Sequence, residues 1–201
     1  MTVAAGDGTG LPRCGWAGSD PEYQRYHDEE WGFPLHGDAA LFEKISLEGF
    51  QSGLSWITIL KRRPAFREAF HGFDIERVAR LTDDEVEELM NNTGIIRNRA
   101  KILATRANAR ITRDLIANAP GALDDIVWGA RPLLPRPRPQ TAAEIPATTA
   151  ESTALSTTLR ALGYRFVGPT TMYALMQSAG VVDDHVVGCW RAQPASRAVR
   201  A

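Results

Sequence analysis

Two pairs of cysteine and histidine residues are the side chains in this sequence best suited to hold a metal ion. His185 and Cys189 are four residues apart, so on a helix both would leave the same face about one turn apart. Cys14 is the only other cysteine, and His27 follows it after twelve intervening residues. Two cysteines and two histidines would fill a tetrahedral Zn²⁺ site and leave no position for a water nucleophile. We therefore predict one structural zinc that joins the N- and C-terminal segments at Cys14, His27, His185 and Cys189.

Other interpretations of these four residues exist. A lone cysteine is more often a small buried hydrophobic residue, and a lone histidine is more often a hydrogen-bonded ring. The two cysteines could also form a disulfide, but the chain begins without a secretory signal, and each cysteine has a histidine nearby. A catalytic zinc would instead need an open coordination position, as in a zinc hydrolase.

Glu48 is the second candidate for chemistry. We expect a helix from Ala39 to about Gln51 with Asp38 as its N-cap, and Leu41, Ile45 and Glu48 fall on one stripe of it. The carboxylate therefore points where a core residue belongs. A buried carboxylate needs a partner, so Glu48 either forms an internal ion pair or lines a pocket and accepts hydrogen bonds from a polar or cationic ligand.

Aromatic residues could share that pocket. Trp56 follows the turn formed by Gly53, Leu54 and Ser55. Asp20 and Pro21 predict the start of a helix that carries Tyr23, Tyr26 and His27, with the two tyrosines on one face. Without other information, core packing is the more common role for such tyrosines.

Composition and length describe a globular protein. The 201 residues are 44% hydrophobic and 23% charged, with a net charge of −1, which argues against indiscriminate nucleic-acid binding. No run approaches eighteen apolar residues, so we expect no membrane partner and a cytoplasmic location. We expect disordered tails at 1–10 and 191–201. Between them, 11–190 should form one compact unit of two helical subdomains, a mixed N- and C-terminal part with the zinc site and a central part.

The predicted elements are all helical, and no period-two strand stands out. Thr148 and Glu151 resemble a capping box for a helix to about Leu162, a glycine-bounded hairpin follows at 163–169, and Thr170 begins another helix. Such a helix-hairpin-helix near 150–180 presents backbone N–H groups to a DNA phosphate. The segment 97–138 could add charge, because its basic residues are Arg97, Arg99, Lys101, Arg106, Arg110, Arg113, Arg131, Arg136 and Arg138 against Asp114, Asp124 and Asp125.

Several of these segments together resemble one family, 3-methyladenine DNA glycosylase I of the helix-hairpin-helix glycosylase superfamily. The resemblance runs from about Arg13 to Cys189, in order and without large gaps. The segments that carry it are Arg13-Cys14-Gly15-Trp16, Tyr26-His27-Asp28 with Trp31-Gly32, Leu47-Glu48-Gly49, Gly53-Leu54-Ser55-Trp56-Ile57, Gly94-Ile95-Ile96-Arg97, Phe166-Val167-Gly168 and Asp184-His185-Val186-Val187-Gly188-Cys189.

The resemblance implies an all-α helix-hairpin-helix glycosylase fold with a zinc clasp at the same four ligands. It also implies hydrolysis of the N-glycosidic bond of N3-methyladenine in alkylated double-stranded DNA, with free 3-methyladenine as the product. The damaged nucleotide would have to be flipped out of the duplex into a pocket. The family's pocket carboxylate falls on Glu48 and its aromatic partners on Tyr23, Tyr26 and Trp56. The DNA-binding hairpin falls on Phe166, Val167, Gly168 and Thr170.

Three further expectations concern mechanism. Thr170 stands where strand-cleaving members of the superfamily have a lysine, and no lysine follows Lys101, so we predict a monofunctional glycosylase. Separately, we expect the protein to be a monomer. Asp183 aligns with a carboxylate that activates water in many superfamily members, or it caps the helix expected to carry the zinc ligands. Leu54 is a candidate wedge for the gap left by the flipped base.

The alternative is a non-catalytic, zinc-stabilised helix-hairpin-helix DNA-binding protein, which would have no use for Glu48.

Overall fold

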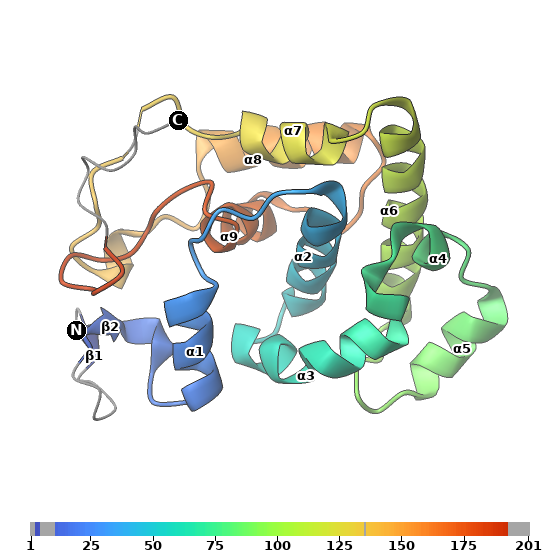
Figure 1. The fold of residues 1–201 in the computed structure, drawn as a ribbon, viewed down its shortest axis with the longest axis horizontal. Helices are drawn as coiled ribbons and strands as arrows, with labels where there is room; N and C mark the ends of the chain where they lie inside the picture. The colour runs from blue at the N-terminus through green and yellow to red at the C-terminus, as the bar shows by residue number, and fades with distance from the viewer. Residues whose placement is uncertain (1–2, 5–10, 135, 193–201) are drawn as a thin grey trace.

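Helix α2, Asp38–Gln51, lies at the centre of the fold. It packs against α3 (Trp56–Ala69), α6 (Arg99–Asn118), α7 (Ala122–Gly129) and α9 (Pro169–Ser178), as Figure 1 shows. The computed structural model describes residues 3–4, 11–134 and 136–192. Almost the whole second half of α2 is buried, including Ile45, Glu48 and Phe50. Because α2 touches so many neighbours, a polar group on it is held from several sides.

The remaining elements surround this centre. They are α1 (Pro21–Glu29), α4 (Ile75–Ala79), α5 (Asp83–Asn91), α8 (Ala150–Ala161) and the short 3-10 turns η1 (Gly15–Ala17), η2 (His71–Phe73) and η3 (Ala142–Glu144). Helix α4 packs on α6, and α8 packs on α9 across the connection 162–168. None of the helices in the described ranges is both long and apolar enough to cross a lipid bilayer. The all-α expectation is confirmed in its coarse form, and the division into two subdomains stays a prediction.

Helix starts follow local side-chain chemistry at several points. The Asp20 carboxylate accepts hydrogen bonds from the backbone N–H groups of Glu22 and Tyr23, as expected for an N-cap. Thr82 and Glu85 form a capping box at the start of α5. The expected box at Thr148 and Glu151 is wrong by one residue, because the helix is capped by Thr149 with Ser152.

Asp38 does not cap the helix that it begins, which corrects our expectation. Gly37 occupies the N-cap position of α2. The Asp38 carboxylate turns instead to the N-terminus of α7, where it accepts hydrogen bonds from the backbone N–H groups of Gly121, Leu123 and Asp124 at 2.8–3.1 Å. Asp38 thus ties α2 to α7, because helix N-termini attract carboxylates from any part of the chain.

Small departures from helix occur at the two ends of the described chain. Val3–Ala4 (β1) pairs antiparallel with Arg13–Cys14 (β2), so this part of the expected disordered tail is ordered, and no period-two pattern was long enough to predict it. The rest of the tail, at 1–2 and 5–10, lies outside the described residues, as do 193–201. At the other end, the guanidinium of Arg191 lies 3.7 Å from the centroid of the Phe33 ring, so the expected tail from 191 begins with a packed residue.

The segment Val182–Cys189 is not helical, which corrects the expected helix there. It forms turns, with Val187 donating its backbone N–H to the Pro139 carbonyl. Trp190 donates likewise to the Pro12 carbonyl. Backbone bonds to distant segments replace the i to i−4 bonds of a helix, and they bring the C-terminal segment beside β2.

Candidate active site and metal centre

Cys14, His27, His185 and Cys189 meet in one buried cluster. Their ligand atoms all lie within 4.8 Å of one another. Cys189 Sγ is 3.3 Å from His27 Nε2 and 3.5 Å from His185 Nδ1, and Cys14 Sγ is 3.6 Å from His185 Nδ1. Sulfur and nitrogen ligands of a tetrahedral Zn²⁺ lie about 3.5 Å apart at the usual bond lengths. The four donors therefore fit one tetrahedral ion, although the two C-terminal ligands come from a turn.

The protonation of the cluster also suits a metal. The two thiols share a hydrogen bond that lowers the pKa of Cys189 and raises that of Cys14, and the rings of His185 and His27 lower the pKa of Cys189 further. Cys189 is therefore the readier thiolate, which is the form that binds metal.

Asp28 holds His27 in place. The Asp28 carboxylate lies 2.8 Å from His27 Nδ1, so the Nε2 atom is left facing the cluster. Arg13 and the indole of Trp190 donate to the same carboxylate. Burial alone would raise the pKa of Asp28, but these hydrogen bonds lower it to about 2. A carboxylate behind a metal-binding histidine fixes the ring orientation and makes the ligand more basic.

A separate pocket of about 190 Å³ opens between α1, α2 and α9. Eleven residues line it: Trp16, Tyr23, Tyr26, Trp31, Glu48, Gln51, Trp56, Ile145, Ala174, Gln177 and Ser178. The predicted partners Tyr23, Tyr26, Trp56 and Glu48 are thus brought together. The volume is below that of a typical drug-sized pocket, so it suits one planar ring system.

Glu48 is the only carboxylate among the residues that line the pocket. Its Oε1 atom accepts a hydrogen bond from the Ser178 hydroxyl at 3.0 Å and lies 4.0 Å from Lys44 Nζ. Its Oε2 atom is buried without a hydrogen-bond partner, and so is the indole Nε1 of Trp56. Burial raises the pKa of Glu48, while Lys44 and Ser178 oppose that rise. The pocket wall therefore offers one acceptor and one donor to a ligand.

Lys44 does not line the pocket, but it contacts residues that do, and sequence reasoning missed it. Its Nζ donates to the Tyr26 hydroxyl at 2.7 Å and lies 4.5 Å from the centroid of the Trp56 ring. Burial lowers the pKa of Lys44 to about 8, although the negative charge of Glu48 counteracts this. Its place one helical turn before Glu48, on a buried face, was the available signal.

The predicted DNA-contacting residues lie in two loops and in the first turn of α9. Leu54 is 42% exposed in the turn after α2, and Phe166 is 38% exposed in the connection between α8 and α9. Thr170 is exposed in the first turn of α9, and Gly168 is its N-cap. Val167 is buried, so that only its backbone could reach DNA.

Asp183 is not among the residues that line the pocket. Its carboxylate pairs with Arg138 at 2.7 Å and accepts a hydrogen bond from the His185 backbone N–H at 3.1 Å. It cannot cap a zinc-bearing helix, because no helix forms there.

Much of the positive charge expected to face phosphate is engaged inside the protein. Arg99 pairs with Glu87, Arg106 with Asp83, and Arg136 with Asp184. The Lys101 ammonium binds two backbone carbonyls and is buried. Most of the basic side chains of 97–138 therefore have partners within the protein, and several of them join separate elements. The count of charged residues alone did not reveal these contacts.

The pocket, the cluster and the helical framework place this chain in a known class. The sequence model of the methyladenine glycosylase family matches residues 16–192. The chain belongs to the methyladenine glycosylase family.

Individual relatives are similar over nearly the whole chain. DNA-3-methyladenine glycosylase 1 of Escherichia coli K12 is 46% identical over 180 residues, which is 89% of this chain and 96% of that protein. A crystal structure of 3-methyladenine DNA glycosylase I superposes with a TM-score of 0.86 at 44% identity, covering 90% of this chain and 100% of that one. A variant of 3-methyladenine DNA glycosylase I solved in complex with 3-methyladenine has a TM-score of 0.82 at 32% identity, over 88% of this chain and 95% of that one.

Proposed function

We propose that this protein excises N3-methyladenine from alkylated double-stranded DNA by hydrolysing the N-glycosidic bond, and that it releases free 3-methyladenine. The observation that carries the proposal is the buried, unpartnered Oε2 of Glu48 in a pocket walled by aromatic rings. The names of the relatives support the same substrate, and one of them was solved with 3-methyladenine bound.

The chemistry of the lesion explains why so little apparatus is needed. In DNA, N3-methyladenine is cationic, so its glycosidic bond is labile and the base leaves as a neutral molecule. Tyr23, Tyr26 and Trp56 would stack on the flat ring, and their π-faces attract a cation. Glu48 would accept a hydrogen bond from the base and complement its positive charge. Undamaged adenine lacks both the charge and the good leaving group.

A base inside a duplex cannot reach this pocket, so we infer that the nucleotide is flipped out. Leu54 would fill the gap in the stack, and the backbone around Phe166, Val167, Gly168 and Thr170 would bind phosphate at the N-terminus of α9. The arrangement α8, connection 162–168 and α9 supports this helix-hairpin-helix role. We expect a monomer to carry out the reaction.

We further propose that one Zn²⁺ occupies Cys14, His27, His185 and Cys189 as a structural ion. Four protein ligands at suitable separations leave no room for a bound water, which disfavours a zinc hydrolase. A non-catalytic DNA-binding module is also disfavoured, because it would not need an unpartnered carboxylate in a pocket.

The test is the replacement Glu48→Gln, which keeps the shape and removes the charge. Excision from methylated duplex DNA, followed by chromatography of released bases, should fall by roughly 100-fold. Binding of free 3-methyladenine, measured by the fluorescence of the pocket tryptophans, should weaken as well. The exposed Glu88→Gln should change neither quantity. Excision by Glu48→Gln at the rate of the unmodified protein would disprove the proposal.

Lyase activity is tested separately. The three lysines are Lys44, Lys61 and Lys101, and Lys44 is the one that contacts pocket residues. Its nitrogen is buried and bonded to Tyr26, which supports a monofunctional enzyme. Borohydride should therefore trap no covalent DNA adduct. A trapped adduct that disappears in Lys44→Met would show the opposite.

Asp183 has a different proposed role from the one its alignment suggested. Its contacts with Arg138 and the His185 backbone support a positioning role at the metal cluster. Asp183→Asn should lower the melting temperature and leave the excision rate nearly unchanged. A large fall in kcat with unaltered base binding would instead identify it as the carboxylate that activates water.

A further inference from the structure

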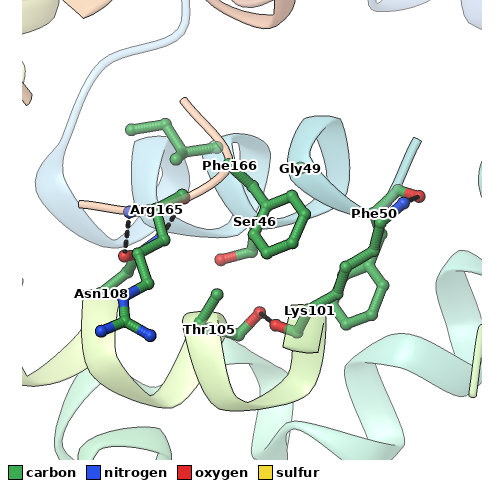
Figure 2. Close-up of a pocket in the computed structure, with 10 residues that line it drawn as sticks. Ser46, Gly49, Phe50, Lys101, Thr105, Asn108, Arg165 and Phe166 are labelled. Atoms are coloured by element: carbon green, nitrogen blue, oxygen red, sulfur yellow. Dashed lines mark hydrogen bonds between the residues drawn. The ribbon is translucent and has the colours of Figure 1, made fainter. Parts of the chain in front are cut away.

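Two buried polar side chains of α6 bond to the backbones of different loops. Lys101 and Asn108 are seven residues apart, which is two helical turns, so they lie on the same face of α6. Only 7% of Lys101 and 4% of Asn108 are exposed. Figure 2 shows both side chains, drawn on α6, with Phe50 and Phe166 beside them.

Lys101 holds the end of α2. Its Nζ donates to the Phe50 carbonyl at 2.8 Å and to the Ser52 carbonyl at 2.6 Å. These are among the last carbonyls of α2, which have no partner within the helix and carry the negative end of its dipole. Burial lowers the pKa of Lys101, so its place there has a cost that the two bonds offset. The turn that follows carries Leu54. Because Lys101 holds the carbonyls at the start of this turn, it also fixes the direction in which the turn leaves α2.

Asn108 holds the connection between α8 and α9. Its side-chain Nδ2 donates to the Arg165 carbonyl at 3.1 Å, and its Oδ1 accepts the Arg165 backbone N–H at 2.9 Å. Both bonds appear as dashed lines in Figure 2. One turn further along α6, the Thr112 hydroxyl lies 2.7 Å from the hydroxyl of Tyr164. Phe166, which follows Arg165, has a φ of +58°, which is unfavourable for a side chain of this size. The connection therefore needs the hydrogen bonds from Asn108 to hold this backbone conformation.

The two loops also meet at α2 itself. A Cβ placed on Gly49 would lie 3.3 Å from Phe166 Cβ, so Phe166 rests on the helix where a glycine permits close approach. The Phe166 ring centroid is 6.0 Å from Lys101 Nζ. A hollow of about 10 Å³, room for about one water, lies between these groups and Asn108.

We propose that Lys101 and Asn108 are positioning residues that fix the turn 52–55 and the connection 162–168 at a set spacing, so that both engage DNA around one flipped nucleotide. The inference rests on the proposed function, which assigns these two loops to DNA. Neither side chain lines the base pocket. Their loss should therefore impair action on DNA and spare recognition of the free base.

The experiment compares Lys101→Met and Asn108→Leu with the unmodified protein, well below the melting temperature of each variant. For both, kcat/KM on methylated duplex DNA should fall by roughly 10- to 100-fold, since small misplacements are costly. Affinity for a duplex with an abasic-site analogue should fall in parallel. Affinity for free 3-methyladenine should stay within about two-fold. Lys101→Arg, which keeps the donors, should recover most of the excision.

Two controls separate positioning from charge and from folding. Arg113→Met removes a positive charge from α6 where Arg113 pairs with the exposed Asp114, and it should leave excision nearly unchanged. Leu54→Ala, at an exposed position, should reduce excision, and adding Lys101→Met should cause little further loss, because both act through the same turn.

The inference is overturned if the α6 variants excise as well as the unmodified protein, or lose free-base binding and excision equally. It is also overturned if the Leu54 and Lys101 losses are fully additive. An unmodified protein that neither binds 3-methyladenine nor excises it would refute the proposed function instead.

Discussion

At the scale of single residues, the pocket depends on how two buried charges are balanced. Glu48 and Lys44 are one helical turn apart on α2, with 4.0 Å between Oε1 and Nζ. Burial disfavours both charged forms, and each charge favours the other. An unpartnered Glu48 would take up a proton more readily and would then lose its attraction for a cationic base. Lys44 therefore helps to keep the pocket negative at Oε2.

Lys44 should make stability depend on pH in a defined window. Its pKa in the folded protein is about 8 against 10.5 for a free lysine. Between these values the unfolded chain binds more protons, so stability from this group rises with pH. From pH 7.5 to 9.5, the protein should gain about 2 kcal/mol relative to Lys44→Met. Urea unfolding at both pH values measures this difference. The exposed Lys61→Met should show the same change in free energy of unfolding between the two pH values as the unmodified protein. The same change in Lys44→Met would contradict the prediction.

At the scale of elements, side chains join helices that are distant in sequence. The Arg63 guanidinium on α3 binds Glu30 at the end of α1 through two hydrogen bonds. These helices both border the pocket, where α1 supplies Tyr23 and Tyr26 and α3 supplies Trp56. The ion pair therefore joins the two helices that carry these aromatic residues.

This ion pair should contribute stability that is lost in acid. Burial would raise the pKa of Glu30, but the hydrogen bonds and charge of Arg63, with help from Arg25, lower it to about 2. The contribution is thus complete above the unfolded pKa of 4.5 and disappears as pH falls through about 2. Arg63→Met should cost about 1–2 kcal/mol at pH 7 and much less near pH 2.5. Equal losses at the two pH values would show that packing, and not charge, is the cause.

Asp38 offers a second prediction at this scale. Because its carboxylate accepts three backbone N–H groups of the α7 N-terminus, Asp38→Ala should destabilise the protein by about 2 kcal/mol. Asp38→Asn keeps one acceptor oxygen and should cost less. Asp74→Ala, which removes a single capping bond from the short α4, provides the comparison. Chemical unfolding of the three variants gives the ranking, and Asp38→Ala no worse than Asp74→Ala would contradict it.

At the scale of the whole molecule, the cluster of Cys14, His27, His185 and Cys189 joins segments from the two ends of the fold. Cys14 and His27 come from the start of the fold and His185 and Cys189 from its end, and the Trp190 to Pro12 backbone bond lies beside them. The binding energy of an ion there is folding energy, because the unfolded chain has no such site.

We expect the unmodified protein to copurify with one zinc ion, and Cys14→Ser should lower the melting temperature by roughly 10 °C and abolish that zinc content. Cys189→Ser should have the same effect, and the double variant should be no worse, since either replacement already loses the ion. Metal content and thermal unfolding with and without a chelator provide the measurements. At low temperature, base binding should persist. If a chelator leaves the melting temperature of the unmodified protein unchanged, the proposal of a structural zinc is wrong.

The sequence by itself determined what local chemistry can determine. Helical periodicity placed Glu48 on a buried stripe, and the capping residue Asp20 marked a helix start, because these signals act within a few residues. The four residues of the Cys14, His27, His185 and Cys189 cluster were identifiable from their types, since few other partners existed for two cysteines.

Only the tertiary structure decided which partners these residues take. Asp38 caps a distant helix, His185 and Cys189 lie on a turn held by remote backbone, and Lys44 contacts Tyr26 beside the pocket. The basic residues of 97–138 mostly bind acids and carbonyls within the protein. The physical reason is that unsatisfied N–H groups, carbonyls and buried charges accept any suitable group that the fold brings near, and that proximity is not written in local sequence.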